Sequence, residues 1–319
     1  MPEMMDIYSQ ALCSFKHLNF VILDTRINDT ALQHLFVSPQ FRVLRLSIWP
    51  DQLRAFSPPP TVIPLRNVKA LDLSLCNLCP LLQALRPDHQ HFEYIMLRLV
   101  QLESATHIGS LFAGLAPPHR NSCLRLFHLS CMHPGRTEDN VPSALSFNTL
   151  RLLTCHTNLQ WLFIRLENPI SLSDEELEYL ARSWPLLDAV CISYFSPLPP
   201  ESNCITFKGL LLLASVCPKL RDVHLTLDGR EVPSCPAELG SKTITKLWFT
   251  ESPIDNQARR VAEFLLKHFP CLTSVSGAFK RPRRFGNGND GEEWKRVVEY
   301  IVDPSKLERT VPGVDDGGI

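Results

Sequence analysis

A single hydrophobic pattern repeats in the middle of the chain, between positions 157 and 228. It reads L-x-x-L-x-L at Leu159–Ile164, recurs in a close variant at Leu187–Ile192, and begins a third time at Leu220–Leu225. The last two apolar positions of each copy are two residues apart, which places them on the same face of a β-strand. A stretch of helical period and a proline follow each of the first two copies. The pattern therefore predicts a unit of strand, loop and helix that occurs in series.

The two predicted helices carry the signals of helix starts and buried faces. Ser173 and Glu176, three residues apart, match a capping box at the start of the first helix. Its apolar residues recur at the spacing of one helix face: Leu177, Leu180, Ala181 and Trp184. The second helix follows Thr206 and repeats that face with Phe207, Leu210, Leu211 and Ala214. Because one unit alone leaves apolar faces exposed, we expect the units to stack on one another.

Ten segments match the strand pattern, with first apolar positions at Leu18, Phe41, Val68, Phe92, Leu124, Leu159, Leu187, Leu220, Ile244 and Leu272. Successive positions lie 23 to 35 residues apart, and a leucine-rich repeat takes about 20–29 residues. The pattern predicts an α/β leucine-rich-repeat solenoid, a horseshoe with parallel strands on its concave face and helices on its convex face. The alternative is a (β/α)8 barrel, which needs about eight near-continuous apolar strands and glycine-rich loops. We favour the solenoid because the chain has only 13 glycines.

The remaining elements divide the chain into three parts. Residues 1–17 form a helical lead-in, residues 18–302 the solenoid of about ten units, and residues 303–319 a flexible tail. Further helix starts are predicted at Asn28, Ser104, Phe147 and Ser252-Pro-Ile-Asp255. The helix after Ser252 is expected to bury Val261, Phe264, Leu265 and His268. A last helix at 292–302 is expected to cap the final repeat with Trp294, Val297, Val298 and Ile301.

Composition and charge narrow the class of protein. The formal net charge is −1, which favours neither nucleic acid nor an anionic membrane as a partner. No apolar run reaches the 18 or so residues that span a bilayer, and the first residues lack the pattern of a signal peptide. Eleven cysteines in such a chain indicate a reducing compartment. We therefore expect the protein in the cytoplasm, the nucleus or both.

Catalytic and metal-binding motifs do not emerge from the sequence. It contains no glycine-rich phosphate loop, no G-x-S-x-G and no H-E-x-x-H. Cys76 and Cys79 form a C-x-x-C without a second pair at zinc-site spacing, and His89 and His91 lack a carboxylate placed by sequence. The sequence thus predicts a non-enzymatic protein without catalytic residues, cofactor or metal.

The predicted concave face is rich in large side chains. Residues that alternate with the buried strand positions point toward the inside of the horseshoe. Aromatic residues, Met and Arg are enriched at the centres of protein interfaces. We predict a partner-binding surface formed by Tyr94, Met96, Arg98, His128, Trp161, Phe163, Arg165, His224 and Trp248. Two alternatives remain open: the loop 132–147 folds over this surface, or the strand register is shifted by one and these residues are core.

A compact basic cluster supports a second hypothesis. It consists of Lys280, Arg281, Arg283 and Arg284. Such a cluster is typical of a nuclear localisation signal or of phosphate contacts, and also of a solvated loop. The corresponding alternative function is that of a nuclear, nucleic-acid-associated repeat protein, although the net charge makes nucleic acid the less favoured partner.

The repeats resemble the leucine-rich-repeat region of fungal F-box-like proteins. The matching segments are Leu172-Ser-Asp-Glu-Glu-Leu-Glu-Tyr-Leu-Ala with Trp184-Pro, Ile205-Thr-Phe-Lys-Gly-Leu-Leu-Leu-Leu-Ala with Cys217-Pro-Lys-Leu, and Ser252-Pro-Ile-Asp with Phe269-Pro-Cys-Leu. The resemblance covers about residues 157 to 275. It implies substrate recognition for a cullin-RING ubiquitin ligase, through an N-terminal F-box that docks the ligase adaptor. No L-P-x-E-helix pattern of an F-box precedes the first repeat in this chain.

Overall fold

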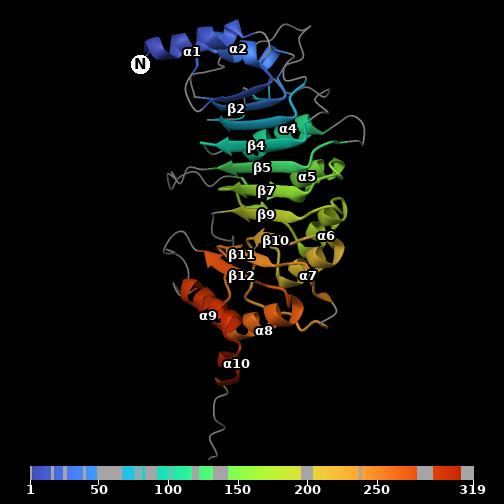
Figure 1. Cartoon of the computed structure of the whole chain (residues 1–319). Helices are drawn as coiled ribbons and strands as arrows, with labels where there is room; N and C mark the ends of the chain where they lie inside the picture. The colour runs from blue at the N-terminus through green and yellow to red at the C-terminus, as the bar shows by residue number, and fades with distance from the viewer. Residues whose placement is uncertain are drawn as a thin grey trace, which may run out of the picture.

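Ten parallel strands form one sheet, and their order in the sheet is their order in the chain. The computed structural model describes residues 2–15, 18–23, 27–38, 41–48, 67–75, 78, 81–82, 92–100, 103–116, 122–131, 143–194, 204–236, 239–278 and 290–309. The strands are β1 (Phe20–Leu23), β2 (Val43–Ile48), β3 (Ala70–Leu75), β4 (Tyr94–Leu99), β5 (Leu126–Cys131), β7 (Trp161–Leu166), β9 (Ala189–Tyr194), β10 (Asp222–Leu225), β11 (Lys246–Thr250) and β12 (Ser274–Ala278). Figure 1 shows them stacked as successive rungs.

Each strand begins two residues after the first apolar position of its predicted segment. The strands pair residue for residue, so equivalent apolar positions lie side by side across the sheet. Leu71, Ile95, Phe127 and Leu162 form part of one such row, and all are buried. The period of two in the sequence therefore fixed both the strands and the face that each one buries.

Helices lie along one side of the sheet and at its two ends. They are α1 (Pro2–Ser14), α2 (Asp29–Val37), α4 (Ala105–Leu115), α5 (Phe147–Leu150), the 3-10 helix η1 (Arg151–Cys155), α6 (Asp174–Arg182), α7 (Phe207–Val216), α8 (Ala258–His268), α9 (Asp290–Val302) and α10 (Ser305–Arg309). In Figure 1, α4 to α7 follow one side of the sheet, α1 and α2 lie at the β1 end, and α8 and α9 lie at the β12 end. A small second sheet pairs β6 (Leu145–Ser146) with β8 (Ile170–Ser171).

This arrangement confirms the α/β class with a parallel sheet. β1 and β12 lie at opposite ends of the ten-stranded order, and within the described residues they do not pair with each other. A closed eight-stranded barrel is therefore wrong for this chain. Across the described part of the chain, no helix has both the length and the apolar character to cross a membrane.

The predicted helix caps at Asn28, Ser104, Ser173 and Thr206 are confirmed. The capping box is complete: the Glu176 backbone N–H donates to Ser173 Oγ at 3.2 Å, and the Ser173 backbone N–H donates to Glu176 Oε2 at 2.9 Å. The first turn of α6 also reaches the next unit through Asp174, which is almost fully buried. Thr206 donates its backbone N–H to Asp174 Oδ1 at 2.8 Å and its hydroxyl to Oδ2 at 2.7 Å.

Asp174 thus links the starts of α6 and α7. A Cβ at Gly209 would collide with the Asp174 carboxylate, so glycine is needed where the two helices approach. We expect Asp174→Ala to lower the free energy of unfolding by about 2–4 kcal/mol, because two partly buried donors of Thr206 lose their charged acceptor. The matched control is Glu175→Ala, which removes an exposed ion pair with Lys208 and should cost much less stability. Urea unfolding curves of the two variants measure the difference, and equal losses would contradict this role of Asp174.

Three predicted elements differ from the structure. The helix expected at Ser252 begins only at Ala258, after residues with positive φ at Glu251, Asp255 and Asn256. The Ser252 hydroxyl is already used, because it accepts from Leu227 N at 2.9 Å and donates to Thr250 O at 3.1 Å. The four residues expected on the inner face of that helix are nevertheless buried.

The other two differences are a shorter helix than expected and a helix where none was expected. The helix expected to start at Phe147 is a single α-helical turn, α5, followed by η1. Residues 303–319 were expected to lack regular structure, but Ser305–Arg309 form α10, and 310–319 lie outside the described residues.

The β12 end of the sheet is closed by α9, as the sequence predicted for its last helix. Trp294 is buried and stacks on Phe249 with ring centroids 4.6 Å apart. Its Nε1 donates to Ser252 O at 2.8 Å. A Cβ at Gly277 would overlap the Trp294 ring, so the glycine in β12 leaves the space that this side chain fills. Val297 is also buried, and Val298 and Ile301 are half-buried.

Candidate functional site: one face of the parallel sheet

The nine residues predicted to bind a partner all lie on one face of the sheet. They belong to β4, β5, β7, β10 and β11, and they alternate with the buried apolar residues of those strands. We call this surface the sheet face and define it by the strand residues that alternate with the buried positions. Tyr94 is 37% exposed and Trp248 is 48% exposed, and the other seven are half-buried. A register shifted by one residue is therefore wrong.

Strand pairing aligns the sheet-face residues into rows. One row runs through Arg45, Asp72, Met96, His128, Phe163, Cys191, His224 and Trp248. Neighbouring parallel strands lie about 4.8 Å apart, so adjacent members of the row are close enough to touch. His128 stacks on Phe163 with ring centroids 5.7 Å apart, and His224 meets Trp248 edge to face at the same separation.

Strand β9 divides the sheet face into two groups. Its three residues on this face, Ala189, Cys191 and Ser193, are buried, although the alternation alone would leave them accessible. Burial raises the pKa of the Cys191 thiol to about 11, so it stays protonated and unreactive near neutral pH. The large side chains therefore gather over β4–β7 on one side of β9 and over β10–β11 on the other.

An ion-pair network joins β2, β3 and β4 on the sheet face. Asp72 Oδ1 lies 2.8 Å from Arg98 Nη1, and Asp72 Oδ2 lies 3.4 Å from Arg45 Nε. Arg98 Nη2 also lies 2.8 Å from Met96 Sδ. Of the three charged residues, only Arg98 was among the nine predicted to bind a partner. Arg45 and Asp72 occupy the corresponding positions of the strand pattern in β2 and β3.

The two histidines of the sheet face have lowered pKa values, chiefly because both are buried. Burial chiefly lowers the pKa of His128, and the charges of Arg98 and Arg165 lower it further against the opposing effect of Asp72. Burial and the charge of Arg165 lower the pKa of His224 to about 4. Both rings are therefore neutral at pH 7 and hydrogen-bond hydroxyls: His128 contacts Ser130 at 3.0 Å, and His224 contacts Thr250.

The charged side chains of the strands on this face are predominantly cationic. In the described strands, four cationic residues and two carboxylates lie on this face: Arg45, Arg98, Arg165 and Lys246, with Asp72 and Asp222. Lys246 Nζ lies 3.5 Å from Asp222 Oδ2 at the exposed end of β10 and β11. The excess of positive charge favours acidic groups on whatever binds here.

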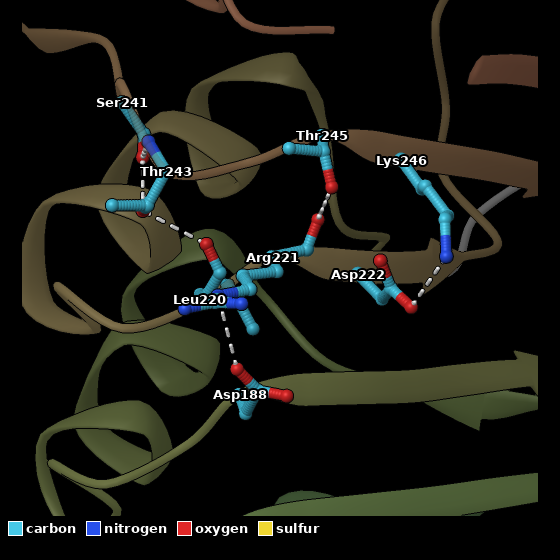
Figure 2. A network of polar contacts seen from close by, with 8 residues as sticks. All are labelled: Asp188, Leu220, Arg221, Asp222, Ser241, Thr243, Thr245 and Lys246. Atoms are coloured by element: carbon cyan, nitrogen blue, oxygen red, sulfur yellow. Dashed lines mark hydrogen bonds and ion pairs between the residues drawn. The ribbon is translucent and has the colours of Figure 1, made fainter. Parts of the chain in front are cut away.

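Polar contacts at the starts of the strands hold consecutive units together rather than forming a reactive site. Figure 2 shows Arg221 facing Asp188 of the preceding unit, with Nε and Oδ1 3.5 Å apart. The Thr243 hydroxyl donates to the Leu220 carbonyl at 2.9 Å, and the Thr245 hydroxyl approaches the Arg221 carbonyl at 3.5 Å. Exposed ion pairs of this kind contribute little free energy, so their main effect is on alignment.

A buried serine–histidine contact joins the segments that lead into β5 and β7. Ser122 Oγ is 2.5 Å from His156 Nδ1, and Ser122 Oγ also accepts from Leu124 N at 3.1 Å. Both side chains are almost fully buried, and burial lowers the pKa of His156 to about 4. Such a serine is not accessible to a substrate, so we assign the pair a structural role.

This histidine makes stability depend on pH. Its pKa is lowered in the folded state from an ordinary value of 6.5, so the stabilisation is complete above pH 6.5 and is lost as the pH falls toward 4. We expect urea unfolding to show a loss of about 2 kcal/mol from His156 between pH 7.5 and pH 5. His156→Gln should show a correspondingly smaller loss over the same interval. An unchanged pH dependence in the variant would contradict the assignment.

Several predicted features fall outside the described residues. These are the basic cluster Lys280, Arg281, Arg283 and Arg284, the pairs Cys76/Cys79 and His89/His91, and residues 132–142 of the loop 132–147. Among the residues that are described, no group of three or more His, Cys, Asp or Glu side chains is placed to hold a metal ion.

Comparison with known proteins does not add a relationship. A scan against models of protein families finds no match, and a search among curated proteins finds none either.

Proposed function

We propose that the chain is a leucine-rich-repeat solenoid and a non-enzymatic scaffold that binds a protein on its sheet face. The repeat spacing of the sequence and the strand order of the sheet support the solenoid, since each repeat of such a fold contacts mainly its neighbours. The main support for binding is that aromatic, Met, His and Arg side chains of five strands share one face, on which Tyr94 and Trp248 are well exposed. Side chains of these types dominate the energetics of protein interfaces.

The proposed partner presents apolar and acidic groups together. Trp161 and Phe163 on β7 and Trp248 on β11 supply the apolar contacts. Arg98 and Arg165 supply donors that suit carboxylates, because a guanidinium can bind a carboxylate through two parallel hydrogen bonds. Contacts to Arg98 and Arg165 should set the association rate and its salt dependence. Contacts to the aromatic side chains should set the dissociation rate.

The resemblance to F-box-like proteins suggests a specific setting, that of a substrate receptor in a cullin-RING ubiquitin ligase. Affinity purification of the tagged protein, with mass spectrometry of the retained proteins, tests both the binding of a partner and the association with a ligase. Retention of a ligase adaptor and a cullin together with a further protein supports the receptor. Retention of a partner without ligase components supports a stand-alone scaffold, and retention of no partner at 50 mM salt contradicts both.

A further inference from the structure

The sheet face carries two rows of different chemistry that run across the strands. The first row joins the first residues of six neighbouring strands, from β1 to β7, and is apolar throughout: Phe20, Val43, Ala70, Tyr94, Leu126 and Trp161. We call it the apolar row, and it crosses the successive rungs of Figure 1. None of its side chains is buried, and Phe20 and Tyr94 are well exposed.

The second row lies four residues further along the same strands and is polar. It consists of Ser47, Ser74, Arg98, Ser130 and Arg165, and we call it the cationic row. None of its five residues is a carboxylate, and none is buried. Between the two rows lie Arg45 and Asp72, whose charges offset each other. From β1 to β7, the described sheet face therefore has its net positive charge in the cationic row.

The size of this surface matches one α-helix laid across the strands. Six strands about 4.8 Å apart span about 24 Å, the length of about 16 helical residues. The two rows are about 13 Å apart, close to the width of a helix with its side chains. On the next strand, β9, the apolar row would continue with Ala189, but that residue is buried. The accessible row therefore ends at Trp161.

The spacing of the strands favours a helix over an extended segment. Side chains on one face of a helix recur about every 5.4 Å, and those on one face of an extended chain about every 6.6 Å. Over five strand gaps of about 4.8 Å, the helix falls about 3 Å out of step and the extended chain about 9 Å. A helix also satisfies its own backbone hydrogen bonds, whereas an extended segment lying on the sheet face would bury unpaired groups.

We propose that the sheet face from β1 to β7 binds an acidic amphipathic α-helix of a partner protein. The helix lies across the strands, with its apolar stripe on the apolar row and with Asp or Glu side chains on the flank that meets Arg98 and Arg165. This inference rests on the proposed function, because it names the element that the sheet face would bind. Trp248, beyond β9, is left to another part of the partner.

Three fluorescein-labelled peptides test the inference on the full chain. The acidic helix LEQLLEQLEQLLEQLEQL has its leucines on one face and its glutamates on an adjoining flank. We expect it to bind saturably in fluorescence anisotropy at low ionic strength. The basic peptide LKQLLKQLKQLLKQLKQL should bind more weakly by about tenfold or more. LEQLLEPLEQLLEPLEQL keeps the charges and the leucines but contains two helix-breaking prolines, and its affinity should fall by about tenfold or more.

Variants of the protein locate the bound helix. Tyr94→Ser/Trp161→Ser and Arg98→Gln/Arg165→Gln should each weaken binding of the acidic helix by about tenfold or more, and the arginine variant should also reduce the salt dependence. Lys246→Gln and Trp248→Ser, beyond β9, are the matched controls and should leave the affinity within about twofold. Circular dichroism verifies that each variant is folded.

Three outcomes would overturn the inference: no binding of the acidic helix, equal binding of the proline or the basic peptide, and binding that survives both double variants. Each can be separated from failure of the proposed function. If the acidic helix does not bind but Trp161→Ala/Trp248→Ala still loses a protein in affinity purification, the sheet face binds a partner of another shape. If neither binding is seen, both proposals are wrong.

Discussion

Trp294→Ala is expected to lower the free energy of unfolding by about 3–5 kcal/mol, the range for removing a buried aromatic side chain. The indole is 1% exposed, stacks on Phe249 and hydrogen-bonds the Ser252 carbonyl. Alanine would leave a cavity between β12 and α9 and a buried carbonyl without its donor. Chemical unfolding followed by circular dichroism measures the loss.

Two companion variants make this test specific. Trp248→Ala removes the same side chain from a site that is 48% exposed, so its stability cost should stay below about 1 kcal/mol. Gly277→Ala should destabilise the protein while Trp294 is present and have much less effect after Trp294→Ala, because its Cβ would occupy the space of the indole. Equal losses from Trp294→Ala and Trp248→Ala would show that α9 does not close the sheet as described.

Trp161→Ala/Trp248→Ala is expected to weaken binding of the partner by at least a hundredfold. Each tryptophan at the centre of an interface contributes about 2 kcal/mol or more, and about 1.4 kcal/mol is a factor of ten in affinity. The two side chains lie on opposite sides of β9, so a partner that needs both must span the middle of the sheet face. Titration of the purified partner into each form measures the change.

The control for this prediction is a pair of exposed apolar residues on the helices. Tyr179→Ala/Val302→Ala changes side chains that are 54% and 79% exposed on α6 and α9. We expect the affinity of this control to stay within about twofold of the wild type. If the control loses as much affinity as the tryptophan variant, the partner binds the helical side of the protein.

The strands were predictable because their signal is local. A period of two in apolar residues selects the buried face of each strand, and repetition of the pattern ten times fixes the strand order. The start of α8 was not predictable, because the hydroxyl of Ser252 bonds to Leu227 and Thr250 in the preceding turns. Contacts between distant residues decide such cases, and local propensity does not report them.

The candidate site was also predictable only in part. The alternation of strand residues identified which side chains share the sheet face, from Tyr94 on β4 to Trp248 on β11. It did not identify the pairing of Asp72 with Arg45 and Arg98, which depends on side-chain reach across three strands. Nor did it identify the burial of β9, whose three residues on the sheet face, Ala189, Cys191 and Ser193, are all buried.

The most direct test of binding through the sheet face is quantitative affinity purification of three forms side by side: wild type, Trp161→Ala/Trp248→Ala, and Tyr179→Ala/Val302→Ala. Our account predicts that at least one protein retained by the wild type and by the helix-side control falls at least tenfold with the tryptophan variant, while all three forms unfold at similar temperatures. Identical retained proteins with all three forms would contradict the assignment of the sheet face as the binding surface.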